Sequence, residues 1–438
     1  MKAIAAIILI LALPIGYLAA LAARSTPTEL KLQDHIKVIG TNTPIRIVAV
    51  NPHGIRRFTA VLEQDGKSYP VFERQEPARR WAVIRKVEDR RTYTFEAGSK
   101  AAPGLRDGKV MLRIEAVSND LLARREPLQM ELEVNTKPPA VSVDEGQHYI
   151  TLGGSEVVAF TVAGYWTEAG VRVGKYTFRS FPMPGANSPN RRICFFAYPY
   201  DAPEGTVPIV YTRNPTGAEA TARFWNKVTR KKFRTREILV GDAFLNKIFA
   251  ALDPAGSGNP VARFMKINND MRQANAQTLA SFRDVTAGKI LWNGPFIQLA
   301  NSSVEAQFCD FRKYFYHGQS VDQQVHLGFD LAVTARTPVV AANDGKVIHA
   351  GPLGIYGNTI VIDHGLGLQS LYAHLSEIQA KAGSDAKKGQ VIGKSGATGL
   401  AGGDHLHYGM QVDGVPVNPV EWWDAHWIKD RVLSVLAR

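Results

Sequence analysis

Four histidines and one aspartate lie in three short motifs, and these residue types could do metal-assisted chemistry. The first motif holds His326 and Asp330, the second His374, and the third His405 and His407. Zinc in hydrolases usually takes three such ligands and keeps a fourth position for water. The five groups exceed that need by two, which leaves two histidines for proton transfer or charge stabilisation. Because a structural zinc more often uses cysteine and none is near, we predict a catalytic site.

The elements that position the second and third motifs are predicted to be β-strands. His405 and His407 lie in an alternating run that ends at the turn signal Asp413-Gly414. Residues two apart on a strand face the same way, so both imidazoles should project from one face. His374 lies in a similar run and is predicted to share a strand face with Tyr372.

The first motif has a different expected geometry. His326 and Asp330 are four residues apart, but Gly328 and the β-rich surroundings argue against one helical face. We expect a loop that enters a strand, with the two side chains brought together by tertiary folding.

The motifs H-x-x-x-D, Y-A-H-L-S and H-L-H resemble those of the lysostaphin-like, LytM-type zinc endopeptidases, which cut peptide bridges in bacterial cell walls. The likeness covers about residues 290–425. It implies one zinc ion bound by His326, Asp330 and His407, with His374 and His405 as the catalytic pair. It also implies that the substrate is the peptide part of peptidoglycan.

Two positions depart from the family's pattern. Arg336 stands where Gly is usual, and Asp404 stands where Pro is usual before H-L-H. Neither change removes a ligand, although Asp404 could alter the charge at the mouth of the site. The alternative function is a non-catalytic partner that binds peptidoglycan or activates another wall hydrolase. Degenerate relatives of that kind typically lack several metal-site residues, whereas this chain keeps all five.

The length and charge of the chain limit its architecture and partners. With 438 residues, two to four domains are expected. The net charge of +12 indicates anionic surroundings. No nucleic-acid module is recognisable, so we expect no nucleic-acid partner and favour anionic phospholipid or acidic wall polymers. The densest basic cluster, residues 227–236, is interpreted as a solvated connector, with contact to such polymers as the alternative.

The N-terminal segment, residues 1–25, is predicted to be a membrane anchor or a signal segment. Ala3 to Ala23 is almost unbroken apolar sequence, long enough to span a bilayer. A secretory signal is the alternative, because Pro14 could end its apolar region and Ala20-Leu21-Ala22 offers a cleavage site. We favour the retained anchor. The body of the protein is then expected in the cell envelope, in the periplasm or outside the cell.

The remaining chain is predicted to be multi-domain and mainly β, with two immunoglobulin-like β domains. Period-two alternation and turn signals indicate the β domains, a Pro pair near residue 138 separates them, and helical spacing of apolar residues indicates the connector. Envelope proteins are possible partners of the β domains. The predicted parts are 26–136 and 137–236 (the β domains), 237–289 (a short helical connector), 290–425 (the β-rich LytM-type metallopeptidase domain) and 426–438 (a C-terminal helix).

Two further local predictions concern the connector and the cysteines. A helix over residues 244–252 is expected, and a second should open at Asn259-Pro260, where Asn can cap and Pro suits the first turn. Cys194 and Cys309 lie among aromatic residues, which favours two buried free thiols over a disulfide bond. An envelope protein could still oxidise them if the geometry allows.

Overall fold

The computed structural model of the protein describes residues 2–79 and 89–437. These residues form two compact units. The first contains residues up to 139 together with 164–167 and 213–219, and the second contains the rest up to 438. The predicted limits of the five smaller domains stay predictions.

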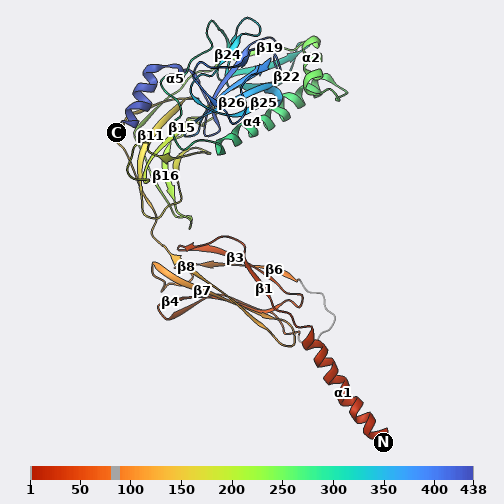
Figure 1. Ribbon diagram of the computed structural model, residues 1–438. Coiled ribbons are helices and arrows are strands. Elements are labelled where there is room, and N and C mark those ends of the chain that lie inside the picture. Colours follow the sequence, from red (N-terminus) through yellow and green to blue (C-terminus); the bar gives the residue numbers. More distant parts are fainter. Residues whose placement is uncertain (1, 80–88, 438) are drawn as a thin grey trace. The chain divides into compact units, whose positions relative to one another are not determined.

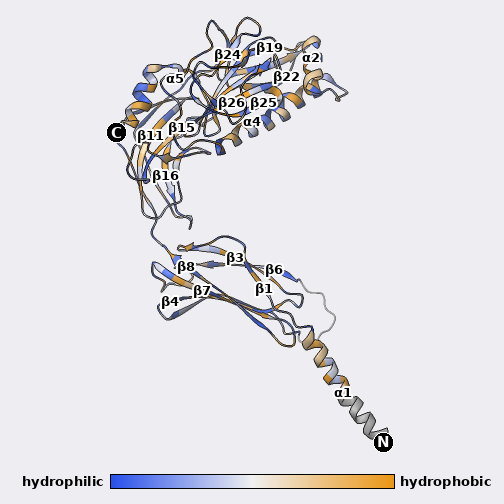
Figure 2. Ribbon diagram, in the orientation of Figure 1, coloured by the Kyte–Doolittle hydropathy of each residue, from blue (hydrophilic) through white to orange (hydrophobic). Residues whose placement is uncertain are grey.

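Helix α1 (Lys2–Ala23) occupies the predicted N-terminal segment. Its coloured residues are largely hydrophobic in Figure 2. Among the described residues, no helix meets the length and apolarity needed to cross a membrane. The role of this segment, as a membrane anchor or a signal segment, stays a prediction.

The first unit contains a β-sandwich (Figure 1). Apolar residues of both sheets, among them Ile47 and Phe95 from one and Phe58 and Leu112 from the other, share one buried cluster. The alternating runs produce this packing because every second side chain of a strand faces the same side. An immunoglobulin-like topology is not confirmed. One sheet has the order β1-β3-β6 (Glu29–Leu32, Thr43–Val50, Arg90–Ala97), and the other β2-β8-β7-β4-β5 (Val38–Ile39, Arg125–Val134, Gly108–Ser118, Ile55–Gln64, Lys67–Gln75).

A second β region follows, and most of it belongs to the second unit. Cys194 lies buried in its central strand β15, and Cys309 is buried further along the chain. Both thiols are free, as predicted. The immunoglobulin-like character of this region is likewise not confirmed. Its strands are β9 (Ala140–Val143), β10 (His148–Thr151), β11 (Ser155–Ala163), β12 (Glu168–Val173), β13 (Tyr176–Arg179), β14 (Phe181–Pro182), β15 (Arg191–Ala197), β16 (Ile209–Arg213), β17 (Glu219–Ala222), β18 (Asn226–Thr229) and β19 (Thr235–Leu239).

Two helical segments form the predicted connector. The first, α2 (Asp242–Leu252), matches the predicted range. The second opens where expected, with the Asn259 side chain accepting a hydrogen bond from the Ala262 amide and Pro260 in the first turn. It comprises α3 (Pro260–Lys266), the π-helical turn η1 (Ile267–Met271), α4 (Arg272–Ser281) and the 3-10 turn η2 (Phe282–Asp284).

The connector belongs to the core of the C-terminal part of the chain. Ile248 and Phe264 pack in one buried cluster with Tyr314 and Ile355, which come from that part. Strand β19 also pairs in parallel with β21 (Asp310–Tyr316). The helices therefore stabilise the C-terminal sheets, and deleting them would expose this cluster.

The strands of the C-terminal sheets hold four of the five predicted site residues, and His405 directly precedes one of these strands. Strand β31 lies between β23 and β27 in an eight-stranded sheet. A second sheet has the order β19-β21-β22, with β22 at Gln319–His326. The large sheet contains β20 (Ser303–Ala306), β23 (Phe329–Ala332), β31 (Leu406–Val412), β27 (Leu368–Leu375), β26 (Asn358–Gly365), β25 (Gly345–Pro352), β29 (Asp385–Ala386) and β32 (Val415–Val417). A third sheet contains β24 (Pro338–Val340), β30 (Val391–Lys394) and β28 (Glu377–Ile378), and the turn η3 spans Gly354–Tyr356.

The C-terminal segment is helical and packs on the second β region of the same unit. The Glu421 carboxylate accepts hydrogen bonds from the backbone amide (2.7 Å) and the hydroxyl (3.1 Å) of Ser155. The indole nitrogen of Trp422 donates to the same hydroxyl at 3.0 Å. The segment comprises α5 (Val420–Trp423), α6 (Ala425–Trp427), η4 (Ile428–Leu433) and α7 (Ser434–Leu436).

The buried position of Glu421 predicts a pH-dependent stability. Burial raises the pKa of Glu421 from 4.5 to about 7. The folded state therefore keeps a proton that the unfolded state has lost, and stability falls as the pH rises from 4.5 towards 7. We therefore expect the free energy of unfolding of Glu421→Gln to rise relative to that of the native chain as the pH increases from 4.5. The difference should reach about 3 kcal/mol at pH 8.

Denaturant unfolding of both proteins at pH 4.5, 6 and 8 measures this difference. The exposed Glu237→Gln is the matched control and should show no such trend. If the stability difference between Glu421→Gln and the native chain is the same at all three pH values, the raised pKa of Glu421 is contradicted.

Candidate metal centre

Strand pairing brings the first and third motifs together. Asp330 on β23 lies directly opposite His407 on β31. Directly opposed residues of antiparallel strands project from the same face. His326 is the last residue of β22 and not part of a loop, and Leu327 and Gly328 carry the chain on to β23. The expected convergence of His326 and Asp330 is present.

Three ligand atoms meet at this point. Nε2 of His326, Oδ1 of Asp330 and Nδ1 of His407 lie 2.9 Å from one another. These three residues form a group that could hold a metal ion. Both imidazoles are almost fully buried, and the Asp330 side chain is 13% exposed.

The protonation of His326 indicates that a cation fits between these atoms. Its Nδ1 lies 3.0 Å from the carbonyl oxygen of Gln307, so Nδ1 carries the proton and Nε2 presents a lone pair. That lone pair faces the Asp330 carboxylate at 2.9 Å. Two acceptors at this distance repel each other unless a proton or a cation lies between them. Two imidazoles and one carboxylate are a donor set that zinc accepts, so the residues present fit a zinc ion.

His374 reaches the site through a backbone irregularity. Ala373 lies opposite His407, so in a regular strand His374 would face the other side of the sheet. The strand pairing shifts register beside His374, whose φ is 62°. The ring of His374 consequently lies 4.9 Å from that of His405 and 5.8 Å from that of His407. Bulges next to active sites re-aim side chains in this way.

His405 lies just before β31 and forms an isolated bridge with Gly396. Its Nδ1 donates to the carbonyl oxygen of Gly403 at 2.9 Å, which leaves Nε2 facing Asp330 at 3.5 Å. As predicted, His405 and His407 project to the same side of the sheet, although His405 is outside the regular strand.

The electrostatics differ between the histidines. Burial lowers the pKa of His374 well below its usual range, and the charges of His405 and His407 act in the same direction. Burial also lowers the pKa of His407, to about 4. For His405, burial lowers the pKa, but the hydrogen bond and charge of Asp330 and the hydrogen bond to Gly403 together outweigh burial, so its pKa is raised. His374 and His405 thus offer one readily neutral and one readily protonated imidazole.

Arg312 is part of the site and was missed by the sequence analysis. Its guanidinium donates to Oδ2 of Asp330 at 2.6 Å, which leaves Oδ1 facing the two histidines. Burial by itself raises the pKa of Asp330, but the charge and hydrogen bonds of the neighbouring imidazoles hold it well below its usual range. Arg312 lies on β21 two residues beyond Asp310, which pairs with His326. Residues two apart on a strand share a face, so the alternation along β21 was the sequence signal that could have identified Arg312.

A cavity of about 250 Å³ gives access to these groups and is called the catalytic cavity below. All five predicted site residues line it. Three arginines, Arg236, Arg272 and Arg312, line it as well. Arg236 belongs to the basic cluster interpreted as a solvated connector, and its guanidinium donates to the carbonyl oxygen of Glu305 at 2.6 Å. That cluster therefore contributes to the wall of the cavity.

The two departures from the family pattern contact each other. The Asp404 carboxylate accepts hydrogen bonds from the Arg336 amide (3.2 Å) and the Ser395 hydroxyl (2.6 Å). Arg336 has a φ of 62°, a conformation that glycine adopts most easily. The charge of Asp404 is thus held against the neighbouring loop.

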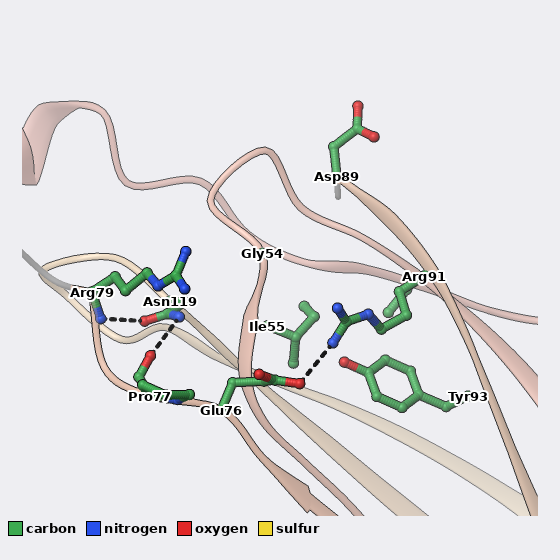
Figure 3. A pocket seen from close by; sticks show the side chains of 10 residues that line it. Gly54, Ile55, Glu76, Pro77, Arg79, Asp89, Arg91, Tyr93 and Asn119 are labelled. Atoms are coloured by element: carbon green, nitrogen blue, oxygen red, sulfur yellow. Dashed lines mark hydrogen bonds and ion pairs between the residues drawn. The ribbon is translucent and has the colours of Figure 1, made fainter. Parts of the chain in front are cut away.

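A different pocket, of about 170 Å³, lies in the N-terminal sandwich (Figure 3). Several of its polar groups pair with one another: Arg91 pairs with Glu76 at 3.1 Å, and the Asn119 side chain bonds the backbone of Pro77 and Arg79. Within the described residues, it holds no group of metal ligands. We assign no chemistry to it.

The fold and the cluster together define a β-sheet domain with a candidate metal centre in an open cavity. Residues 324–419 match Peptidase family M23. Among curated proteins, a DD-carboxypeptidase/endopeptidase, Mpg, from Neisseria meningitidis is 44% identical over 97 residues, which are 22% of this chain and 22% of that protein. The peptidoglycan DD-endopeptidase ShyA from Vibrio cholerae is 43% identical over 96 residues, again 22% of each chain.

Among solved structures, the catalytic domain of the antimicrobial peptidase lysostaphin from Staphylococcus simulans is 27% identical and has a TM-score of 0.22. The aligned region covers 33% of this chain and 96% of the lysostaphin domain. The family match places a peptidase M23 domain in the C-terminal part of the chain. The chain spans less than a quarter of the length of the curated relatives named above.

Proposed function

We propose that this protein is a zinc-dependent endopeptidase that hydrolyses peptide cross-links of bacterial peptidoglycan in the cell envelope. The convergence of His326, Asp330 and His407 at 2.9 Å, with two further histidines beside them, carries the proposal. The M23 match and the names of the relatives support the choice of substrate.

In the proposed mechanism, His326, Asp330 and His407 hold one zinc ion, while His374 and His405 act on the reacting groups. When bound, zinc lowers the pKa of a water molecule towards about 7 and polarises a carbonyl group. Gln307 fixes the tautomer of His326, and Arg312 orients the Asp330 carboxylate. Thr398 and Gly403 accept the Nδ1 protons of the catalytic pair. The Nε2 atoms of His374 and His405 are then the ring nitrogens that move a proton or donate to the tetrahedral oxyanion, and Nε2 of His405 starts 3.5 Å from Asp330.

The direct test is release of soluble peptides from purified peptidoglycan by the purified protein, with and without a chelator. We expect release that stops on chelation and returns when zinc is added. Mass analysis of the fragments identifies the bond that is cut. Zinc-loaded protein that releases no peptide would instead favour the alternative, a non-catalytic protein that binds peptidoglycan or activates another wall hydrolase.

Arg312 provides a separate test of the metal site. Arg312→Gln removes the cation that orients Asp330, and loss of such outer-shell partners typically lowers metal affinity or activity by ~10- to 100-fold. Competition with a chromophoric chelator measures the zinc affinity directly. Lys381→Gln, an exposed charge change in the same domain, should leave the affinity unchanged. Equal zinc affinities of Arg312→Gln and the native protein would show that Arg312 does not support the metal site.

The location and partners of the protein are proposed on the same basis. An enzyme that acts on peptidoglycan must reach the envelope, and the N-terminal segment is the candidate for export or membrane attachment. Envelope proteins are proposed partners of the β regions. Fractionation of cells expressing the full chain and a chain that starts at residue 26 tests the role of that segment, and equal distribution of both would contradict it.

A further inference from the structure

A second cavity adjoins the catalytic cavity and has no assigned role. It has a volume of about 610 Å³ and is called the side cavity below. Arg272, Arg312 and Leu327 line both cavities. These three residues therefore lie between the catalytic cavity and the side cavity.

The chemistry of the side cavity suits an anion. Its charged lining residues are Arg272, Arg312 and Lys313, and none of the described residues that line it is acidic. Amide side chains, such as those of Gln273 and Gln324, line it as well. Phe311, which is 40% exposed, adds an apolar surface. This combination suits a peptide segment that carries a carboxylate.

Arg272 is the basic residue best placed to bind that carboxylate. Arg312 is already engaged with Asp330 at 2.6 Å. Among the described residues, the Arg272 guanidinium donates hydrogen bonds to the carbonyl oxygen (3.1 Å) and the side-chain oxygen (2.6 Å) of Asn268, in the preceding turn of the same helical segment. These contacts orient the guanidinium without neutralising it. Its position where the two cavities meet places the free charge beside the catalytic groups.

We propose that the side cavity is a substrate subsite in which Arg272 binds a free carboxylate of the wall peptide, next to the bond that is cut. The inference rests on the proposed function and adds a substrate requirement to it. The carboxylate can be the C-terminal group of one peptide strand or a side-chain carboxylate. A guanidinium recognises either through paired hydrogen bonds.

The test compares matched cross-linked peptides that carry a free carboxylate or a carboxamide at one position at a time. For the native protein, amidation of the recognised carboxylate should lower kcat/KM by roughly 10- to 100-fold, the range for losing a hydrogen bond to a charged group. Amidation of the other carboxylate should have little effect, which identifies the source. Arg272→Gln should show the same loss on the free carboxylate and no further loss on the carboxamide.

Two controls keep the test decisive. Lys266→Gln removes one positive charge from the same helical segment but lines neither cavity, so its kcat/KM should stay unchanged. Calorimetric binding of both peptides to His405→Ala protein separates recognition from catalysis. Because amidation changes only the substrate, the native protein still gives an answer if Arg272→Gln does not fold.

The outcomes separate the inference from the proposed function. Cleavage of free and amidated peptides at equal rates by the native protein would overturn the inference and leave the function standing. Carboxylate-dependent binding that is lost in Arg272→Gln, without any cleavage by the native protein, would retain the subsite and overturn the endopeptidase function.

Discussion

His326→Ala is expected to abolish both zinc retention and peptide release. Nε2 of His326 is one of the three converging atoms, and its tautomer is fixed by Gln307. Without it, two ligands remain for an ion that needs three. The loss of zinc affinity should exceed the ~10- to 100-fold typical of removing an outer-shell partner. Metal content after dialysis and competition with a chelator measure this loss.

His317→Ala is the matched control, because that imidazole is largely exposed and belongs to no metal-ligand group among the described residues. It should keep one zinc ion per chain and the native rate. Circular dichroism of both variants checks that the fold is retained. A His326→Ala protein with stoichiometric zinc and unchanged turnover would refute the ligand assignment.

His405→Ala is expected to slow hydrolysis while leaving zinc in place. Removing a positioned proton-transfer group typically costs ~10² to 10⁴ in rate, and we expect the loss in kcat. His405 is partly exposed and outside the regular strand, so its replacement should disturb the fold little. Steady-state kinetics and zinc content measured on the same preparation give both quantities.

His405→Gln and His374→Ala complete this experiment. Glutamine keeps a hydrogen-bonding group but cannot take up a proton, so a rate close to that of His405→Ala would assign proton transfer to His405. Rescue by glutamine would assign oxyanion stabilisation instead. Loss of zinc from either alanine variant would show that the residue is a ligand, contrary to the proposed division of roles.

Much of the fold was predictable because the signals are local. Period-two alternation predicted β-strands in the N-terminal sandwich, where β7 and β8 lie, and both residues of the turn signal at 413–414 have positive φ. Helical spacing and the cap at Asn259 predicted the helices of the connector. Their packing partners were not predictable from this spacing. Ile248 and Phe264 pack in the core beside Tyr314. The Arg283 guanidinium of η2 donates to the carbonyl oxygen of Thr177 (3.3 Å) in the second β region and to the Asp413 carboxylate (2.7 Å). Apolar periodicity shows that a face is buried but not against what.

The candidate site was likewise only partly predictable from the sequence. The sequence by itself determined the five residue types, their order and the family likeness, because these are properties of short motifs. Only the tertiary structure decided that Asp330 pairs opposite His407 and that a bulge turns His374 to the same side of the sheet. Strand register and bulges depend on which strands pair and in which alignment, and no local pattern encodes that pairing. For the same reason Arg272 and Arg312, from a helix and a strand that the motifs do not include, became visible only in the folded chain.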